Sequence, residues 1–156
     1  MIVYFMRHGK AEDYSDDDES RALTSDGIRK TEDAARALKV LKAQPSAIFA
    51  SPRKRAQQTA AIVAKAYGME VITRSELNFE FSLALLRDVL SADALGDEVL
   101  MVGHNPSMSQ VIGEVCGVRV EMKKGGIAAV NLPAHNPQHG HLLWLATPAL
   151  LSAISS

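Results

Sequence analysis

The alternation of short apolar runs with amphipathic segments is the feature that most restricts the fold of this chain. Segments with apolar residues at helical spacing lie between four β-rich runs: IVYFM (2–6), AIFA (47–50), MEVIT (69–73) and EVLMV (98–102). Strands that alternate with helices form parallel β-α-β units, and their crossover helices cover both faces of one sheet. We therefore predict an α/β fold of the three-layer α/β/α type.

Two later apolar runs, IAAVNL (127–132) and HLLWLA (141–146), are separated only by the connection PAHNPQHG (133–140). A parallel crossover needs about a dozen residues or more, so these two strands should pair antiparallel. The prediction is a mostly parallel sheet of about six strands with one antiparallel strand. The connection is rich in histidine, His135 included, but its Asn-Pro and His-Gly pairs favour a hairpin over a metal site.

Capping signals mark where the expected helices begin and end. Pro52 and Pro106 suit the first position of a helix, and Gly68 is a stop signal. Residues 82–90 should form a shorter amphipathic helix. Three residues that precede helical segments have side chains suited to an N-cap: Thr24, Ser51 and Asn105.

Size and charge narrow the classes of function. The 156 residues are enough for a single domain over residues 1–156. A formal net charge of −1 argues against a nucleic acid or an anionic membrane as partner. Cys116 is the single cysteine, which excludes an internal disulfide and indicates a reducing compartment. Without a signal peptide or a membrane-length apolar run, we expect a cytoplasmic protein, and a monomer.

Unusual side chains follow three of the predicted parallel strands. The first strand ends in Arg7-His8-Gly9, the second in the segment 51–55 with its arginines, and the fourth in the segment 103–106 with His104. Because the carboxyl ends of parallel strands meet at one edge of the sheet, these residues should lie together.

Arginines and helix N-termini at one sheet edge suit a tetrahedral anion such as phosphate. Guanidinium groups pair with phosphate oxygens, and helix N-termini add free N–H groups. Nearby positive charge disfavours an imidazolium, so His8 should keep a free lone pair near neutral pH and be able to act as a nucleophile. Gly9 leaves room for approach to the ring and lets the backbone turn.

Four motifs in the chain resemble the histidine phosphatase superfamily, which has the phosphoglycerate-mutase-like fold. They follow the family's order: VYFMRHGKA near the start with the RHG motif, RALTSDG (21–27), SPRKRAQQTA (51–60) and LMVGHNPSMS (100–109). The short length and the second and fourth motifs are most similar to the SixA-type phosphohistidine phosphatases, the small branch without inserted cap segments.

The resemblance implies a role for each matching residue. His8 would be the nucleophile that is transiently phosphorylated, and Arg7 would bind the phosphate beside it. The arginine matching the SPxxRAxxT pattern is Arg55, and His104 would bond the transferring phosphoryl group. Gly9 and Asn105 are further candidates for substrate binding, although Asn105 also suits a helix cap. The resemblance implies no metal and no cofactor.

The general acid is where the sequence departs from the wider family. Larger members place a glutamate after the third strand, where this chain reads RSELNFEFS with Glu76 and Glu80. Either is a candidate acid, and neither stands in a clear motif. An alkoxide leaving group needs a proton from an acid, whereas imidazole leaves more readily.

We therefore expect a phosphatase that hydrolyses phosphohistidine on a protein through a covalent intermediate on His8. The alternatives are a phosphatase for small phosphate esters with the same fold and a phosphate-binding module without turnover. A chain too short for a cap suits a phosphohistidine displayed on a protein surface. The partner would then be a phosphorylated protein or a small ester.

Overall fold

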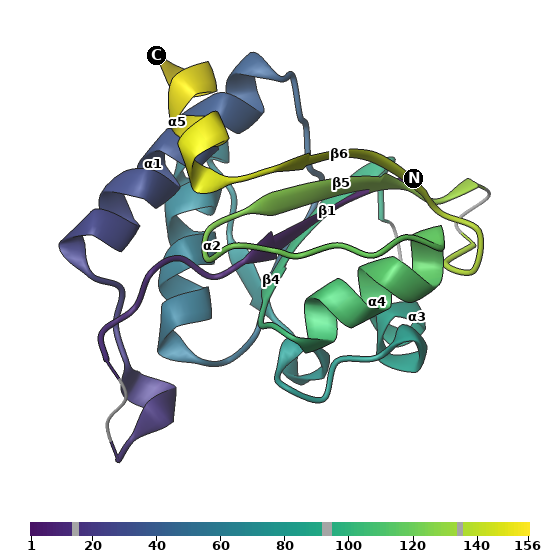
Figure 1. Cartoon of the computed structure of the whole chain (residues 1–156), viewed down its shortest axis with the longest axis horizontal. Coiled ribbons are helices and arrows are strands. Elements are labelled where there is room, and N and C mark those ends of the chain that lie inside the picture. Colours follow the sequence, from purple (N-terminus) through teal and green to yellow (C-terminus); the bar gives the residue numbers. More distant parts are fainter. Residues whose placement is uncertain (14–15, 92–94, 134–135) are drawn as a thin grey trace.

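The computed structural model describes residues 1–13, 16–91, 95–133 and 136–156 (Figure 1). Parts of the acidic segment 12–20 and of the 133–140 connection, His135 included, therefore lie outside the described residues. Within these ranges the sheet has six strands in the order β3-β2-β4-β1-β5-β6. Their bounds are β1 Ile2–Arg7, β2 Ile48–Ala50, β3 Val71–Thr73, β4 Glu98–Gly103, β5 Ile127–Asn131 and β6 His141–Ala146.

The direction of the strands confirms the predicted mixed sheet. Strands β1 and β4 pair in parallel, as do β2 with β4 and β2 with β3. Strand β5 pairs antiparallel with both β1 and β6, so it is the strand that runs against its neighbours. The short connection between β5 and β6 gives the reversal that its length predicts.

Helices cover both faces of the sheet, which gives the predicted three layers (Figure 1). Side chains of α1, α2 and α5 pack on one face, and those of α3 and α4 pack on the other. Side chains of β1 alternate between the two cores, with Tyr4 and Met6 in the first and Val3 and Phe5 in the second. The bounds of the helices are α1 Ser25–Val40, α2 Lys54–Tyr67, α3 Leu83–Leu90, α4 Ser107–Cys116 and α5 Pro148–Ser155.

Several helix ends lie where the sequence predicts them. The Thr24 side chain accepts a hydrogen bond from the Gly27 N–H and caps α1. Gly68 ends α2 in the left-handed conformation, at φ 64°. The pattern analysis did not include α5, which begins at Pro148 and packs against α1.

The predicted start of α2 is wrong by two residues and that of α4 by one. Helix α2 begins at Lys54 after Arg53, which is extended and takes the cap position, while the Ser51 hydroxyl contacts the ring of His104. Helix α4 begins at Ser107 with Pro106 in the cap position. The Asn105 side chain instead accepts from Ser109, one turn further along.

The carboxyl ends of the central strands meet at one edge of the sheet. Arg7 at the end of β1 is paired with Gly103 at the end of β4. The His8 N–H then donates to the Gly103 carbonyl, and the Ser51 N–H after β2 donates to Val102. The three chain segments with unusual side chains therefore start side by side. Among the described residues, no helix is both long enough and apolar enough to span a bilayer.

Candidate active site

His8 lies buried at this edge, where one ring nitrogen donates a hydrogen bond and the other accepts one. Its Nδ1 lies 2.8 Å from the carbonyl oxygen of Gly9, which can only accept, so Nδ1 carries the hydrogen and donates it. Its Nε2 accepts from the Nε–H of Arg55 at 3.3 Å. The lone pair on Nε2 therefore points into the arginine-lined site.

The surroundings of His8 keep its ring neutral. The pKa of His8 is lowered from 6.5 to about 4, chiefly by burial and also by the positive charges of Arg55, Arg7 and Lys124. The hydrogen bond to Gly9 acts in the opposite sense. A neutral imidazole with an accessible lone pair has the electronic state that a nucleophile needs.

Arg55 is almost fully buried, and its guanidinium links His8 to the acidic segment. Its Nη1 donates to the Asp18 carbonyl at 2.9 Å, and its Nη2 lies 3.2 Å from an oxygen of the Asp18 carboxylate. The same carboxylate accepts from Arg53 at 2.6 Å and pairs with Arg21 at 2.8 Å. One carboxylate thus holds three arginines in place.

His104 completes the pair of histidines. Its ring centroid lies 5.2 Å from that of His8. Its Nε2 lies 2.8 Å from the buried hydroxyl of Ser51, which also accepts from the Arg53 N–H. Among the described contacts of the buried Ser51 hydroxyl, Nε2 of His104 is the acceptor available to its hydrogen, so Ser51 donates and the ring hydrogen of His104 is on Nδ1. Burial, with smaller contributions from the neighbouring His8 and Arg55, lowers the pKa of His104 to about 3.

Two buried donors face this site without a partner. Among the described residues, the buried side-chain nitrogen and oxygen atoms that lack a hydrogen bond are Arg7 Nε and His104 Nδ1. Arg7 is anchored at its other end, where Nη1 donates to the Met122 carbonyl at 2.9 Å. Because unsatisfied buried polar groups are costly, both atoms are placed to receive an anionic ligand.

Gly9 has a structural contribution that the sequence did not indicate. Its N–H donates to the Thr59 hydroxyl on α2 at 3.0 Å. A side chain at this position would meet the Thr31 hydroxyl on α1 at 2.9 Å. The glycine therefore lets α1 approach the segment that carries His8. The threonine of the SPRKRAQQTA motif is the residue that bonds to it.

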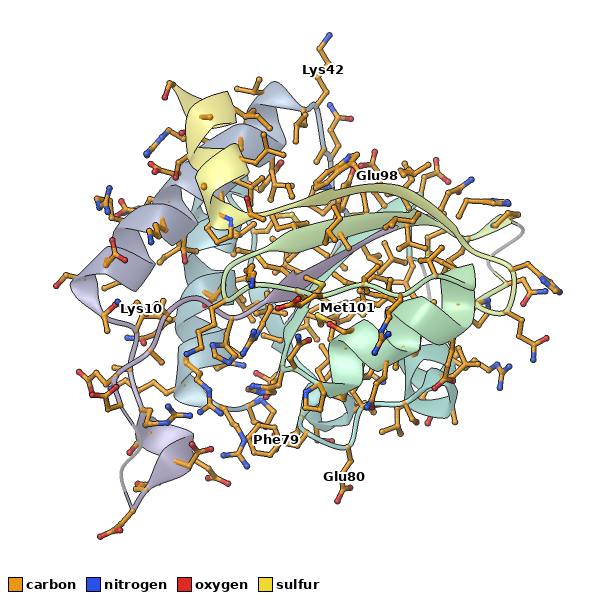
Figure 2. The ribbon with its side chains drawn as sticks, in the orientation of Figure 1. Lys10, Lys42, Phe79, Glu80, Glu98 and Met101 are labelled. Carbon is orange, nitrogen blue, oxygen red and sulfur yellow. The ribbon has the colours of Figure 1, made fainter. Side chains whose placement is uncertain are left out.

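The other predicted site residues are less well placed to meet a ligand. The Asn105 amide donates to the Met122 carbonyl at 3.2 Å, so both ends of its side chain are occupied. Glu76 pairs with Arg74, and that hydrogen bond lowers the pKa of its carboxyl. Glu80 is exposed and extends away from the ribbon (Figure 2).

Three contributors to this site are not among the predicted site residues. Asp18 belongs to the acidic segment 12–20, whose composition does not mark one carboxylate as a partner of the arginines. Lys124 is brought close because the Gly125 N–H donates to the carbonyls of Arg7 and His8. Phe79 packs its ring edge-on against His104 with centroids 4.8 Å apart, beside the nitrogen-bearing side chains in Figure 2. No local signal marks it in RSELNFEFS.

Two neutral imidazoles lie among arginines at the carboxyl edge of an α/β sheet, an arrangement whose charge suits a tetrahedral anion. The model of the histidine phosphatase superfamily (branch 1) matches residues 3–84. The chain therefore belongs to this superfamily of phosphate-releasing hydrolases.

Known proteins agree with this assignment. An uncharacterised protein of Picosynechococcus sp. is 31% identical over 92% of this chain and 95% of its own length. The structure of the protein histidine phosphatase SixA complexed with tungstate is 27% identical and superposes with a TM-score of 0.84 over 96% of this chain and 98% of its own. The alpha-ribazole phosphatase from Shigella flexneri, at 15% identity, shares the fold with a TM-score of 0.74 over 95% of this chain and 97% of its own.

Proposed function

We propose that this protein hydrolyses phosphohistidine on a protein, with His8 as the nucleophile. The observation that carries the proposal is the state of the His8 ring. Nδ1 donates to Gly9, and the lone pair of Nε2 faces Arg55. The partnerless nitrogens of Arg7 and His104 lie at the same site.

The proposed reaction has two steps. Arg7, Arg55 and His104 bind the phosphoryl oxygens, and Arg55 gives up its bond to His8 Nε2 in favour of the ligand. His8 Nε2 then forms a bond to phosphorus while the bond to the leaving group breaks. In the second step a water oxygen attacks phosphorus, its proton is lost to solvent, and His8 regains its lone pair. The guanidinium groups and His104 stabilise the charge on the phosphoryl oxygens in both steps.

The placement of the carboxyl groups favours phosphohistidine over a phosphate ester. An alkoxide leaving group needs a general acid. Glu76 is ionised by its pairing with Arg74, and Glu80 extends into solvent. Imidazole that already carries a hydrogen on its second nitrogen leaves as a neutral molecule and needs no such acid. The similar SixA structure is that of a protein histidine phosphatase, which is consistent with the proposal.

Phosphate release tests the proposal with two substrates in parallel, a phosphohistidine-bearing protein and a simple aryl phosphate. We expect rapid release from the phosphohistidine protein, and loss of release by about a thousandfold or more in His8→Ala. Trapping of ³²P on the wild-type chain, but not on His8→Ala, would locate the intermediate.

The other outcomes select between the alternatives. Comparable release from the aryl phosphate would indicate a general phosphatase for small esters. Binding of phosphate without release from either substrate would indicate a phosphate-binding module and would overturn the proposal.

A further inference from the structure

Phe79 is a large apolar side chain that remains 48% exposed beside the two histidines. Single exposed apolar residues are common on proteins and do not by themselves indicate function. Ile72 and Leu143 are exposed to a similar degree and lie on the edge strands β3 and β6. Phe79 differs in its neighbours, because its ring contacts His104 and lies 5.7 Å from the guanidinium of Arg55.

The ring of Phe79 is held in place by neighbouring side chains. The guanidinium of Arg53 stacks over it, 3.9 Å from the ring centroid. Arg53 is itself fixed, since its Nε donates to the Asn78 side chain at 2.7 Å and its Nη1 to Asp18 at 2.6 Å. The same Asn78 oxygen accepts from the Phe79 N–H at 3.0 Å. These contacts keep the ring in one position without a ligand.

The direction of the reaction places the leaving group near this ring. In-line displacement puts the leaving atom on the side of phosphorus opposite to His8 Nε2. His8 and His104 are buried, so a protein-borne leaving group must extend from the phosphoryl site toward the exposed rim. Phe79 is the exposed aromatic ring in contact with His104 on that route.

We propose that Phe79 is a specificity-determining residue whose exposed ring packs against a planar leaving group, the imidazole of phosphohistidine. The inference rests on the proposed function and adds the residue that recognises the ring. In the step, the P–N bond of the substrate breaks as the bond from His8 Nε2 forms. The phosphohistidine ring reacts with a proton from solvent already on its other nitrogen, so the imidazole keeps the electron pair of the broken bond and leaves as a neutral molecule.

A comparison of two P–N substrates tests this inference. Phosphohistidine has a ring as its leaving group, whereas phosphoramidate has the same type of bond and no ring. We expect Phe79→Ala to lower kcat/KM for phosphohistidine by about three- to tenfold, the range that aromatic pairing supports. The loss with phosphoramidate should be much smaller. Phe79→Trp should keep the preference for phosphohistidine, and Phe79→Leu should lose most of it.

Leu143→Ala is the matched control, because it removes an equally exposed apolar side chain from β6, an edge strand remote from His8 and His104. It should leave both substrates unaffected. An equal loss with both substrates in Phe79→Ala would mean that the ring only supports Arg53 and would overturn the inference, as would no loss with either. If the wild-type protein hydrolyses neither substrate, the proposed function itself fails. If the wild type is active and Phe79→Ala leaves the ratio of kcat/KM between the two substrates unchanged, only the role of Phe79 is contradicted.

Discussion

At the scale of single residues, the state of the two histidine rings is set by neighbouring polar groups. The Gly9 carbonyl selects the tautomer of His8, and the Ser51 hydroxyl does the same for His104. In the proposed reaction, a hydrogen on the wrong nitrogen would remove the nucleophilic lone pair of His8 or the donor that His104 offers. Small polar groups behind the rings therefore decide whether the site can work.

Replacement of Ser51 tests this control of the tautomer. Ser51→Ala leaves a buried ring nitrogen without its partner, which costs about 1–3 kcal/mol, so we expect kcat to fall about tenfold or more. The ¹⁵N spectrum of the His104 ring should change from one tautomer to a mixture. Ser152→Ala removes a hydroxyl that bonds to Asp33 on the α1–α5 side, and it should leave kcat unchanged. Full activity and an unaltered His104 spectrum in Ser51→Ala would contradict this assignment.

At the scale of elements, the first turn of α1 and the segment after β1 touch through two glycines. A methyl group on Gly27 would lie 2.2 Å from the Lys10 carbonyl, and one on Gly9 would meet Thr31. Helix α1 therefore lies against the residues that follow His8. The position of His8, the proposed nucleophile, depends on this close approach, and so does the packing of the helix.

Two glycine substitutions distinguish the effect of this contact on activity from a general loss of stability. Gly27→Ala forces α1 away from Lys10, so we expect at least about a tenfold loss of kcat/KM and about 1–3 kcal/mol of unfolding free energy, as in overpacking. Alanine's better helix propensity, worth about 1 kcal/mol, cannot offset a contact this short. Gly68→Ala meets no atom but strains a left-handed residue at φ 64°. It should cost about 1 kcal/mol and leave activity intact. Equal activity of the two variants would refute the role given to Gly27.

At the scale of the whole molecule, folding keeps two histidines neutral that would titrate in the unfolded chain. Burial, with the charges of nearby arginines, lowers the pKa of His8 to about 4 and that of His104 to about 3. The unfolded chain therefore binds more protons below about pH 6.5, where free histidine titrates. The stability contributed by this difference is complete above that pH and is lost as the pH falls toward the folded-state values.

Urea unfolding between pH 7.5 and 5 measures this effect. Below about pH 6.5, each histidine should lower the unfolding free energy by as much as about 1.4 kcal/mol per pH unit. In His8→Asn, the slope of unfolding free energy against pH should be smaller by the contribution of one histidine. Asp18 and Glu76 have lowered pKa values and affect stability only at more acidic pH, so the chosen range separates the two causes. A wild-type curve that stays level over this range would show that the rings are protonated in the folded state.

The sequence by itself determined the strand–helix alternation, the antiparallel pairing of the last two strands and the convergence of the segments that carry Arg7, His8, Arg55 and His104. These follow from apolar periodicity, connection length and the rule that parallel strands end at one edge, all of which can be read along the chain.

Only the tertiary structure decided the details that concern the chemistry. It identified the free nitrogen of His8, the Asp18 contacts to the arginines, the pairing that ionises Glu76 and the place of Phe79 beside His104. Asp18 and Arg55 are 37 residues apart in the chain, and Ser51 and His104 are 53 apart. Contacts between side chains so distant in sequence depend on packing in three dimensions, which local patterns do not encode.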